Sequence, residues 1–94
     1  MDTQAKLRCL AGSGMFAHEA SVLIQGEAQH YESMVDRELV HATGVEIGTG
    51  TEEVSALLDV TVVKVNGTAM LVELPRQVVS GGRRIWVPKA EVQL

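Results

Sequence analysis

Aromatic residues are nearly missing from this chain of 94 residues, which has one Phe, one Tyr and one Trp. A hydrophobic core with so few rings must be built from aliphatic side chains. The chain is 46% hydrophobic and 21% charged, and four of its hydrophobic residues are Met. This composition is ordinary for a folded globule and argues against a disordered chain. At this length we expect one domain over residues 1–94, with a thin margin of stability.

Cysteine is equally scarce, because Cys9 stands alone. No intrachain disulfide can form, and a reducing compartment fits that composition. The histidines at 18, 30 and 41 are spaced by 12 and 11 residues, whereas zinc motifs need tighter pairs. We therefore expect no metal site and no cofactor. No apolar run approaches the ~18 residues of a membrane helix, and no signal-peptide core follows the N-terminus. We expect a soluble cytoplasmic protein that does not contact a membrane.

The patterns that mark catalytic sites are also missing. The glycines of Gly48-Thr49-Gly50 lack the lysine and the strand-to-helix setting of a phosphate-binding loop. Glu52 and Glu53 are adjacent, so on a strand they would face opposite ways. Nothing local distinguishes Cys9 from a small core residue, although it could be paired on paper with a histidine. We predict that the protein is not an enzyme and has no catalytic residues.

What the chain does have is a strong hairpin signal in residues 59–74, DVTVVKVNGTAMLVEL. Two runs rich in β-branched residues flank Asn66-Gly67, the pair that favours a type I′ turn. We predict that this hairpin is the centre of the fold. A two-residue turn at this pair predicts the cross-strand pairs Val65–Thr68, Val63–Met70 and Val62–Leu71.

Both faces of this hairpin carry apolar side chains. In a sheet with one solvent-exposed face, apolar and polar side chains should alternate more regularly along each strand. Both faces must therefore be covered, either by a sheet that curls into a barrel or by a second subunit. Two-fold dimers are the commonest oligomers, so a homodimer is expected. Its predicted face consists of Val63, Val65, Met70 and Val72.

The rest of the chain reads as short strands separated by turn signals. We expect an all-β fold, a small partly open antiparallel barrel of five or six strands with short 3₁₀ turns. Residues 52–58 allow two readings, a short helix capped by Thr49 or an extension of the central strand, and the continuing β-branched run favours the strand. The further predicted strands are 5–9, 20–25, 29–36, 83–87 and a short one at Val92; the predicted turns are 36–39 and 88–91, and the predicted loops are 41–51 and 77–82.

Two segments that lie 52 residues apart share a layout, MVDRELV at 34–40 and WVPKAEV at 86–92. Valine stands at the second and last places of both, a large apolar residue at the first and a base at the fourth. Such an echo would fit two strand–turn units in a pseudo-symmetric arrangement.

The later of these segments resembles the ending of SH3-like small barrels. That ending is a strand, a 3₁₀ turn begun by proline and a short final strand, here carried by residues 86–92. The resemblance implies a barrel shape. It implies no binding residues, because the Ala-Leu-Tyr-Asp-Tyr-like segment and the tandem tryptophans of signalling SH3 domains are absent and Glu91 replaces their tyrosine.

Charge is unevenly distributed along the chain, whose net charge is −4. Residues 1–60 hold ten acids and three bases (−7), and residues 61–94 hold two acids and five bases (+3). Arginine beside an aromatic ring is typical of phosphate contact with base stacking and also of protein-interface hot spots. The candidate partner-binding residues are Arg76, Arg83, Arg84, Trp86 and Lys89.

These observations lead to two hypotheses about function. The first is a non-catalytic protein–protein interaction or assembly module that self-associates through the central hairpin. Its size and lack of motifs suggest an accessory protein of a bacterium, phage or mobile element. The second is a small barrel that contacts nucleic acid through residues 76–89. The acidic net charge disfavours it, because that affinity comes from phosphate neutralisation.

Overall fold

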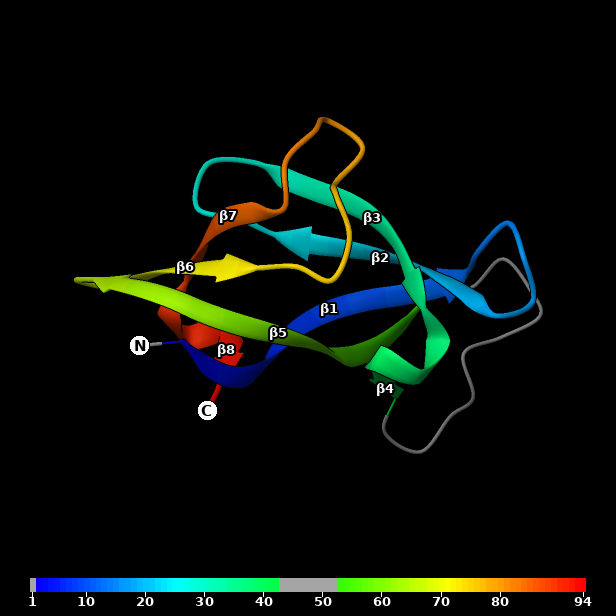
Figure 1. Cartoon of the computed structure of the whole chain (residues 1–94), viewed down its shortest axis with the longest axis horizontal. Helices are drawn as coiled ribbons and strands as arrows, with labels where there is room; N and C mark the ends of the chain where they lie inside the picture. Colours follow the sequence, from blue (N-terminus) through cyan, green and yellow to red (C-terminus); the bar gives the residue numbers. More distant parts are fainter. Residues whose placement is uncertain (1, 43–52) are drawn as a thin grey trace.

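The computed structural model describes residues 2–42 and 53–94, which form one curled antiparallel sheet (Figure 1). The sheet order is β3-β2-β1-β5-β6-β7, with β4 paired to β5 and β8 paired to β1. The predicted all-β, partly open barrel is confirmed, and the described residues form eight strands rather than five or six. The elements are β1 (Thr3–Ser13), β2 (Glu19–Gln25), β3 (His30–Asp36), the 3₁₀ turn η1 (Arg37–Leu39), β4 (Val40–Ala42), β5 (Val54–Asn66), β6 (Ala69–Glu73), β7 (Arg84–Pro88), the 3₁₀ turn η2 (Lys89–Glu91) and β8 (Val92–Gln93).

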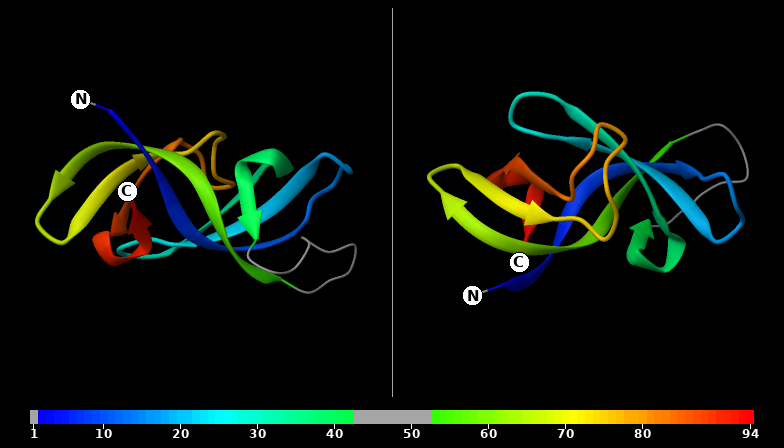
Figure 2. Two further views of the ribbon diagram at one scale, coloured as in Figure 1. Left: turned by 90° about the horizontal axis from the view of Figure 1, so that it is seen from below. Right: turned by 45° about the horizontal axis from the view of Figure 1, so that its top comes forward.

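The curl of the sheet brings other parts of the chain against both outer strands. The connection between β6 and β7 crosses over β3 (Figure 2), where the Val79 N–H donates to the carbonyl of Glu32 at 2.8 Å. At the other edge the Glu27 N–H donates to the carbonyl of Trp86 in β7 at 3.0 Å. These bonds occupy backbone carbonyl groups of the edge strands β3 and β7, which could otherwise pair with a strand of another chain. The barrel is therefore closed at a few points and open elsewhere.

The core lies inside this curl and is aliphatic, as the composition predicts. Alternate residues of the two longest strands point inward, from Ala5 to Ala11 in β1 and from Ala56 to Val62 in β5, and Leu7 and Leu58 are both 0% exposed. These two leucines are also cross-strand partners in the β1–β5 ladder. The largest fully buried side chains are Leu7, Ile24, Leu58, Leu74, Val22, Val35, Val72 and Val87.

The uncertain segment before the hairpin is a strand, as we favoured. β5 is a single strand of 13 residues that begins at Val54. The start of the predicted loop 41–51 differs, because Val40–Ala42 forms β4 and pairs with β5. The rest of that loop, residues 43–51, and Glu52 lie outside the described residues.

The central hairpin is present, but its turn is displaced by one residue. Asn66 pairs with Ala69, so the two turn residues are Gly67 and Thr68. Gly67 has φ +63°, and no residue other than glycine has a positive φ among the described residues. A positive φ at the first turn position alone is the pattern of type II′, so the predicted type I′ turn is wrong.

A β-bulge at Val63 adds a second shift, because the register changes between Val62 and Lys64. The predicted cross-strand pairs are therefore wrong. Val62 pairs with Val72 and Val65 pairs with Met70. In a strand each one-residue shift moves side chains to the other face.

These shifts change the predicted dimer face. Met70 is 3% exposed and Val72 is 0% exposed, since both belong to the core of the chain itself. They cannot contact a partner while the chain stays folded. Val63 is half-buried and Val65 is 51% exposed, so only these two of the four residues are accessible.

The chain is built from two halves with the same order of elements. β1, β2, β3, η1 and β4 are followed by β5, β6, β7, η2 and β8 in equivalent positions. Each half donates its last strand to the first strand of the other: Val40 pairs with Leu58, and Val92 pairs with Leu7. The echo between residues 34–40 and 86–92 is therefore part of a duplication of the whole fold.

The two halves also match in their local geometry. The Arg37 N–H donates to the His18 carbonyl at 2.9 Å, and the Lys89 N–H donates to the Thr68 carbonyl at 2.7 Å. Each bond ties the start of a 3₁₀ turn to the preceding hairpin. The residues before the two turns, Asp36 and Pro88, have φ, ψ of −65°, 135° and −61°, 137°. Proline fits this φ without strain, which explains its place in the second half.

The central position of Leu7 gives a stability prediction. Leu7→Ala should lower the free energy of unfolding by about 2–5 kcal/mol, because it removes buried methyl groups and leaves a cavity. Leu10→Ala in the same strand should cost about 1 kcal/mol or less, since Leu10 is 41% exposed. Urea denaturation followed by circular dichroism measures both. Equal losses would contradict the inward and outward alternation of β1.

Candidate functional site: the outer face of β5, β6 and β7

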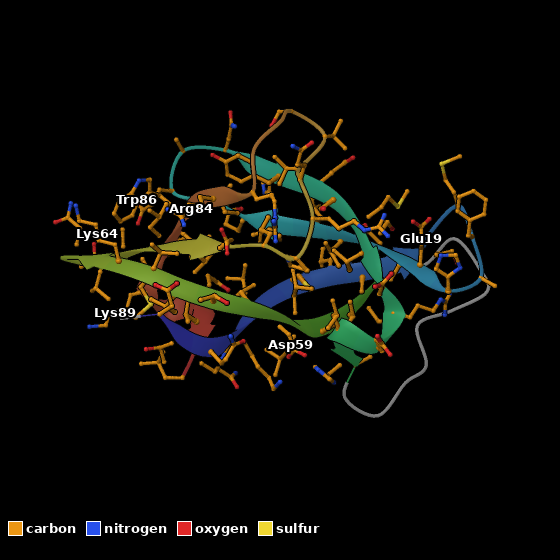
Figure 3. All side chains as sticks on the ribbon, in the orientation of Figure 1. Glu19, Asp59, Lys64, Arg84, Trp86 and Lys89 are labelled. Atoms are coloured by element: carbon orange, nitrogen blue, oxygen red, sulfur yellow. The ribbon has the colours of Figure 1, made fainter. Side chains whose placement is uncertain are left out.

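The five predicted partner-binding residues do not form one cluster. Arg76 reaches the first half of the chain, where its guanidinium lies 3.3 Å from a carboxylate oxygen of Glu19 and 3.6 Å from one of Asp36. The Glu19 side chain is only 9% exposed. Glu19 and Trp86 lie at opposite ends of the molecule (Figure 3). Arg76 therefore holds the connection between β6 and β7 against β2 and β3, far from Trp86.

Two more of the five also lie apart from Trp86. The Arg83 Nε donates to the carbonyl of Leu74 at 3.1 Å, and Arg83 shares a recess with Pro75 and Arg76. Lys89 begins η2 and is well separated from Arg84 and Trp86 in Figure 3. Only Arg84 and Trp86 remain together.

Trp86 is the centre of a mixed apolar and charged surface. In the registers of β5, β6 and β7, Lys64 pairs with Leu71 and Leu71 pairs with Trp86, so the three form one row across the sheet. In the next row Glu73 pairs with Arg84, and the Arg84 Nε lies 3.3 Å from the Glu73 carboxylate. We call these five residues the Trp86 face, and Figure 3 shows Lys64, Arg84 and Trp86 gathered at one end of the sheet.

Alternation along β7 explains why this surface faces outward. Ile85 and Val87 are 4% and 0% exposed and fill the core. Arg84 and Trp86, one residue out of phase, must then point away from it. Because the Trp86 carbonyl also accepts the Glu27 N–H, the strand that carries the ring is held on both edges. The indole is thus presented from a rigid support.

The chemistry of the Trp86 face suits binding. Trp86 and Leu71 are half-buried, and Lys64 and Arg84 are exposed. Lys64 makes no hydrogen bond or ion pair with the residues that the structure describes. Tryptophan and arginine are the residues most enriched in interface hot spots. Lys64 and Leu71 were not among the predicted site residues, because the displaced hairpin turn places Lys64 opposite Leu71 and the register of β6 and β7 places Leu71 opposite Trp86.

A second charged group lies in the middle of the sheet. Asp59 accepts hydrogen bonds from Lys6 at 2.6 Å and His41 at 3.0 Å, which joins β5 to β1 and β4. Burial by itself would raise the pKa of Asp59. The two hydrogen bonds and the nearby positive charges outweigh that effect, so the pKa lies below its usual value. This group is an ion-pair cluster between strands.

The chemistry around Cys9 differs from that of a nucleophile. Burial raises the pKa of its thiol to about 11, so the thiol stays protonated at neutral pH. Within residues 2–42 and 53–94 no group of three or more His, Cys, Asp and Glu side chains could hold a metal ion. No helix in this part of the chain is long and apolar enough to cross a membrane.

Comparison of the chain with protein-family models, with curated proteins and with solved structures finds no match. The function must therefore be argued from the Trp86 face and its surroundings.

The buried Glu19 gives a second stability prediction. Arg76→Ala should lower the free energy of unfolding by about 1–3 kcal/mol, because a buried carboxylate loses its cation. Arg84→Ala removes an ion pair whose partner, Glu73, is 34% exposed, and should cost at most about 1 kcal/mol. Thermal or urea unfolding compares the two variants. If Arg84→Ala lowered the free energy of unfolding more than Arg76→Ala, the contact between Arg76 and Glu19 would not have the predicted importance.

The lowered pKa of Asp59 predicts a pH dependence. A carboxylate whose pKa is lower in the folded state stabilises that state above its unfolded value of about 3.9, and this contribution is lost as the pH falls through the folded value. Asp59→Asn should therefore be less stable than the parent chain at pH 7, and the difference should shrink below about pH 4. Urea midpoints at several pH values measure this difference. Asp2→Asn, which alters an exposed carboxylate, serves as the control and should show no such pH-dependent difference.

Proposed function

We propose that this protein is a non-catalytic assembly module that self-associates through the Trp86 face. The observation that carries the proposal is the row of Lys64, Leu71 and Trp86 on a rigid outer surface of the sheet. Burying a half-exposed indole and leucine against a partner removes apolar surface from water. Val65 is exposed in the same hairpin, but it pairs with the buried Met70 and therefore belongs to the other side of the sheet, so it is not part of this surface.

A second copy of this chain suits the charges of the face. Lys64 lacks a partner among the described residues, whereas the Glu73 carboxylate shares only one of its oxygens with Arg84 at 3.3 Å. In a two-fold dimer each surface meets its own copy. Lys64 of one copy can then approach Glu73 of the other, which places opposite charges around an apolar centre. Such complementarity favours specific pairing.

Nucleic acid is the competing partner, because a ring flanked by two cations can also stack on a base. The separation of Arg76, Arg83 and Lys89 from Trp86 weakens that reading. Only Lys64 and Arg84 remain beside the ring, and Arg84 already pairs with Glu73. Few phosphates can be neutralised by so small a group.

The test is sedimentation equilibrium over micromolar to submillimolar concentrations. The parent chain should dimerise, and Trp86→Ala should raise the dissociation constant about tenfold or more, as expected for a hot spot. Phe16→Ala is the matched control, since Phe16 is also an exposed aromatic residue, at 60%, on the connection between β1 and β2. It should leave dimerisation unchanged.

Two results would overturn the proposal. One is a parent chain that stays monomeric throughout this range. The other is an equal effect of the two substitutions. If the monomer instead binds a fluorescent oligonucleotide at low salt, and Trp86→Ala abolishes that binding, the nucleic-acid function replaces assembly.

A further inference from the structure

The exchange of last strands between the halves leaves a gap along each of the two long strands. On one edge of β1, β8 pairs with residues 6–7 and β2 pairs with residues 10–13, so neither strand pairs with residues 8–9. On the equivalent edge of β5, β4 pairs with residues 56–58 and β6 with residues 61–66, which leaves residues 59–60. A recess lies at each gap, and the duplication allows the two to be compared position by position.

The recess in β5 is small and its charges are satisfied. It has a volume of about 180 Å³. Asp59 lies in it and is bound by Lys6 and His41. Leu39 lines the same recess and packs against the core. The chain itself therefore supplies the partners of the charge in this recess.

The recess in β1 is larger, at about 540 Å³, and its charged side chains have no partner among the described residues. Arg8 takes the place of Asp59, and Glu91 takes the place of Leu39. His30 lies at the same recess. None of these three side chains makes a hydrogen bond or ion pair with a described residue. The same architecture therefore occurs once with a small recess whose charges are paired and once with a larger recess whose charges lack partners among the described residues.

The floor of the larger recess is apolar beside the arginine. In the β1–β5 ladder Leu57 lies opposite Arg8, and in the β1–β2 ladder Leu23 lies opposite Leu10. Leu10 is 41% exposed, although it is surrounded by strands. A cation next to aliphatic side chains matches a carboxylate attached to an aliphatic group. Glu91 and Gln93, at the far side, can accept the N–H groups of an amide or an ammonium.

We propose that this recess binds a carboxylate that carries an aliphatic side chain, with Arg8 holding the carboxylate and Leu10, Leu23 and Leu57 contacting the side chain. A free apolar amino acid and the C-terminus of a peptide share this chemistry. The site is separate from the Trp86 face and does not depend on self-association. Arginine binds carboxylates through two parallel hydrogen bonds, which gives the contact direction as well as strength.

The test is a titration of the labelled protein, followed by the backbone amide resonances of residues 8–10 and 57. Three probes separate the sources: leucine, N-acetyl-leucine and N-acetyl-leucinamide. N-acetyl-leucine mimics a peptide C-terminus, and the leucinamide lacks the carboxylate. Binding of N-acetyl-leucine assigns the recess to peptide C-termini. Binding of leucine without binding of N-acetyl-leucine assigns it to the free amino acid.

Arg8→Gln should raise the dissociation constant of the bound probe about tenfold or more, because it removes a hydrogen bond between two charged groups. Arg83→Gln is the matched control, since Arg83 lines the smaller recess, and it should leave binding unchanged. Circular dichroism checks that both variants are folded. Equal binding of the leucinamide, an equal effect of the two substitutions, or no resonance shift at millimolar probe would overturn the proposal.

Discussion

The fold depends on the contact between β1 and β5, the longest ladder in the sheet. Nine pairs join the two strands, from Thr3–Val62 to Ala11–Val54. Leu7 and Leu58 lie at its middle, and each also pairs with the last strand of the other half. All other strands attach to one of these two, either directly or through a neighbour. Side chains at this crossing can therefore change only if both halves adjust.

The same arrangement separates charges that are paired between strands from charges without a partner among the described residues. Arg76 forms ion pairs with Glu19 and Asp36, and Lys6 forms one with Asp59. These cations therefore hold separate parts of the chain together. Lys64 and Arg8 stand on opposite long strands, and neither has such a partner within the described residues. Charged side chains without internal partners, beside exposed aliphatic ones, are where a partner or ligand gains most. Both proposals rest on that distinction.

Local patterns predicted most of the elements. The β-branched run before Asn66 indicated a long strand, and Pro88 indicated the turn that became η2, because each signal concerns backbone preferences of neighbouring residues. The hairpin turn was misplaced since glycine suits both type I′ and type II′ turns. Nothing in the run of valines marks Val63 as the bulge, so the residues that face the core could not be assigned.

The candidate site was harder to predict for a related reason. Arg83 and Arg84 are adjacent in sequence, yet Arg83 precedes β7 and contacts the Leu74 carbonyl, whereas Arg84 begins β7 and contacts the Glu73 carboxylate. Arg76 finds its partner 57 positions away. Grouping the residues by nearness in sequence therefore predicted a larger cluster than the structure has. It also could not identify Leu71, which lies beside Trp86 through the register of β6 and β7.

The reciprocal strand exchange bears on how the chain can come apart. Removing β8 uncovers part of β1 in the other half, and removing β4 does the same to β5. Neither half retains all of its strand pairs without the other. A chain with one half unfolded should therefore not be a stable intermediate. The duplicated chain should lose its structure in one concerted step, with calorimetric and van't Hoff enthalpies that agree.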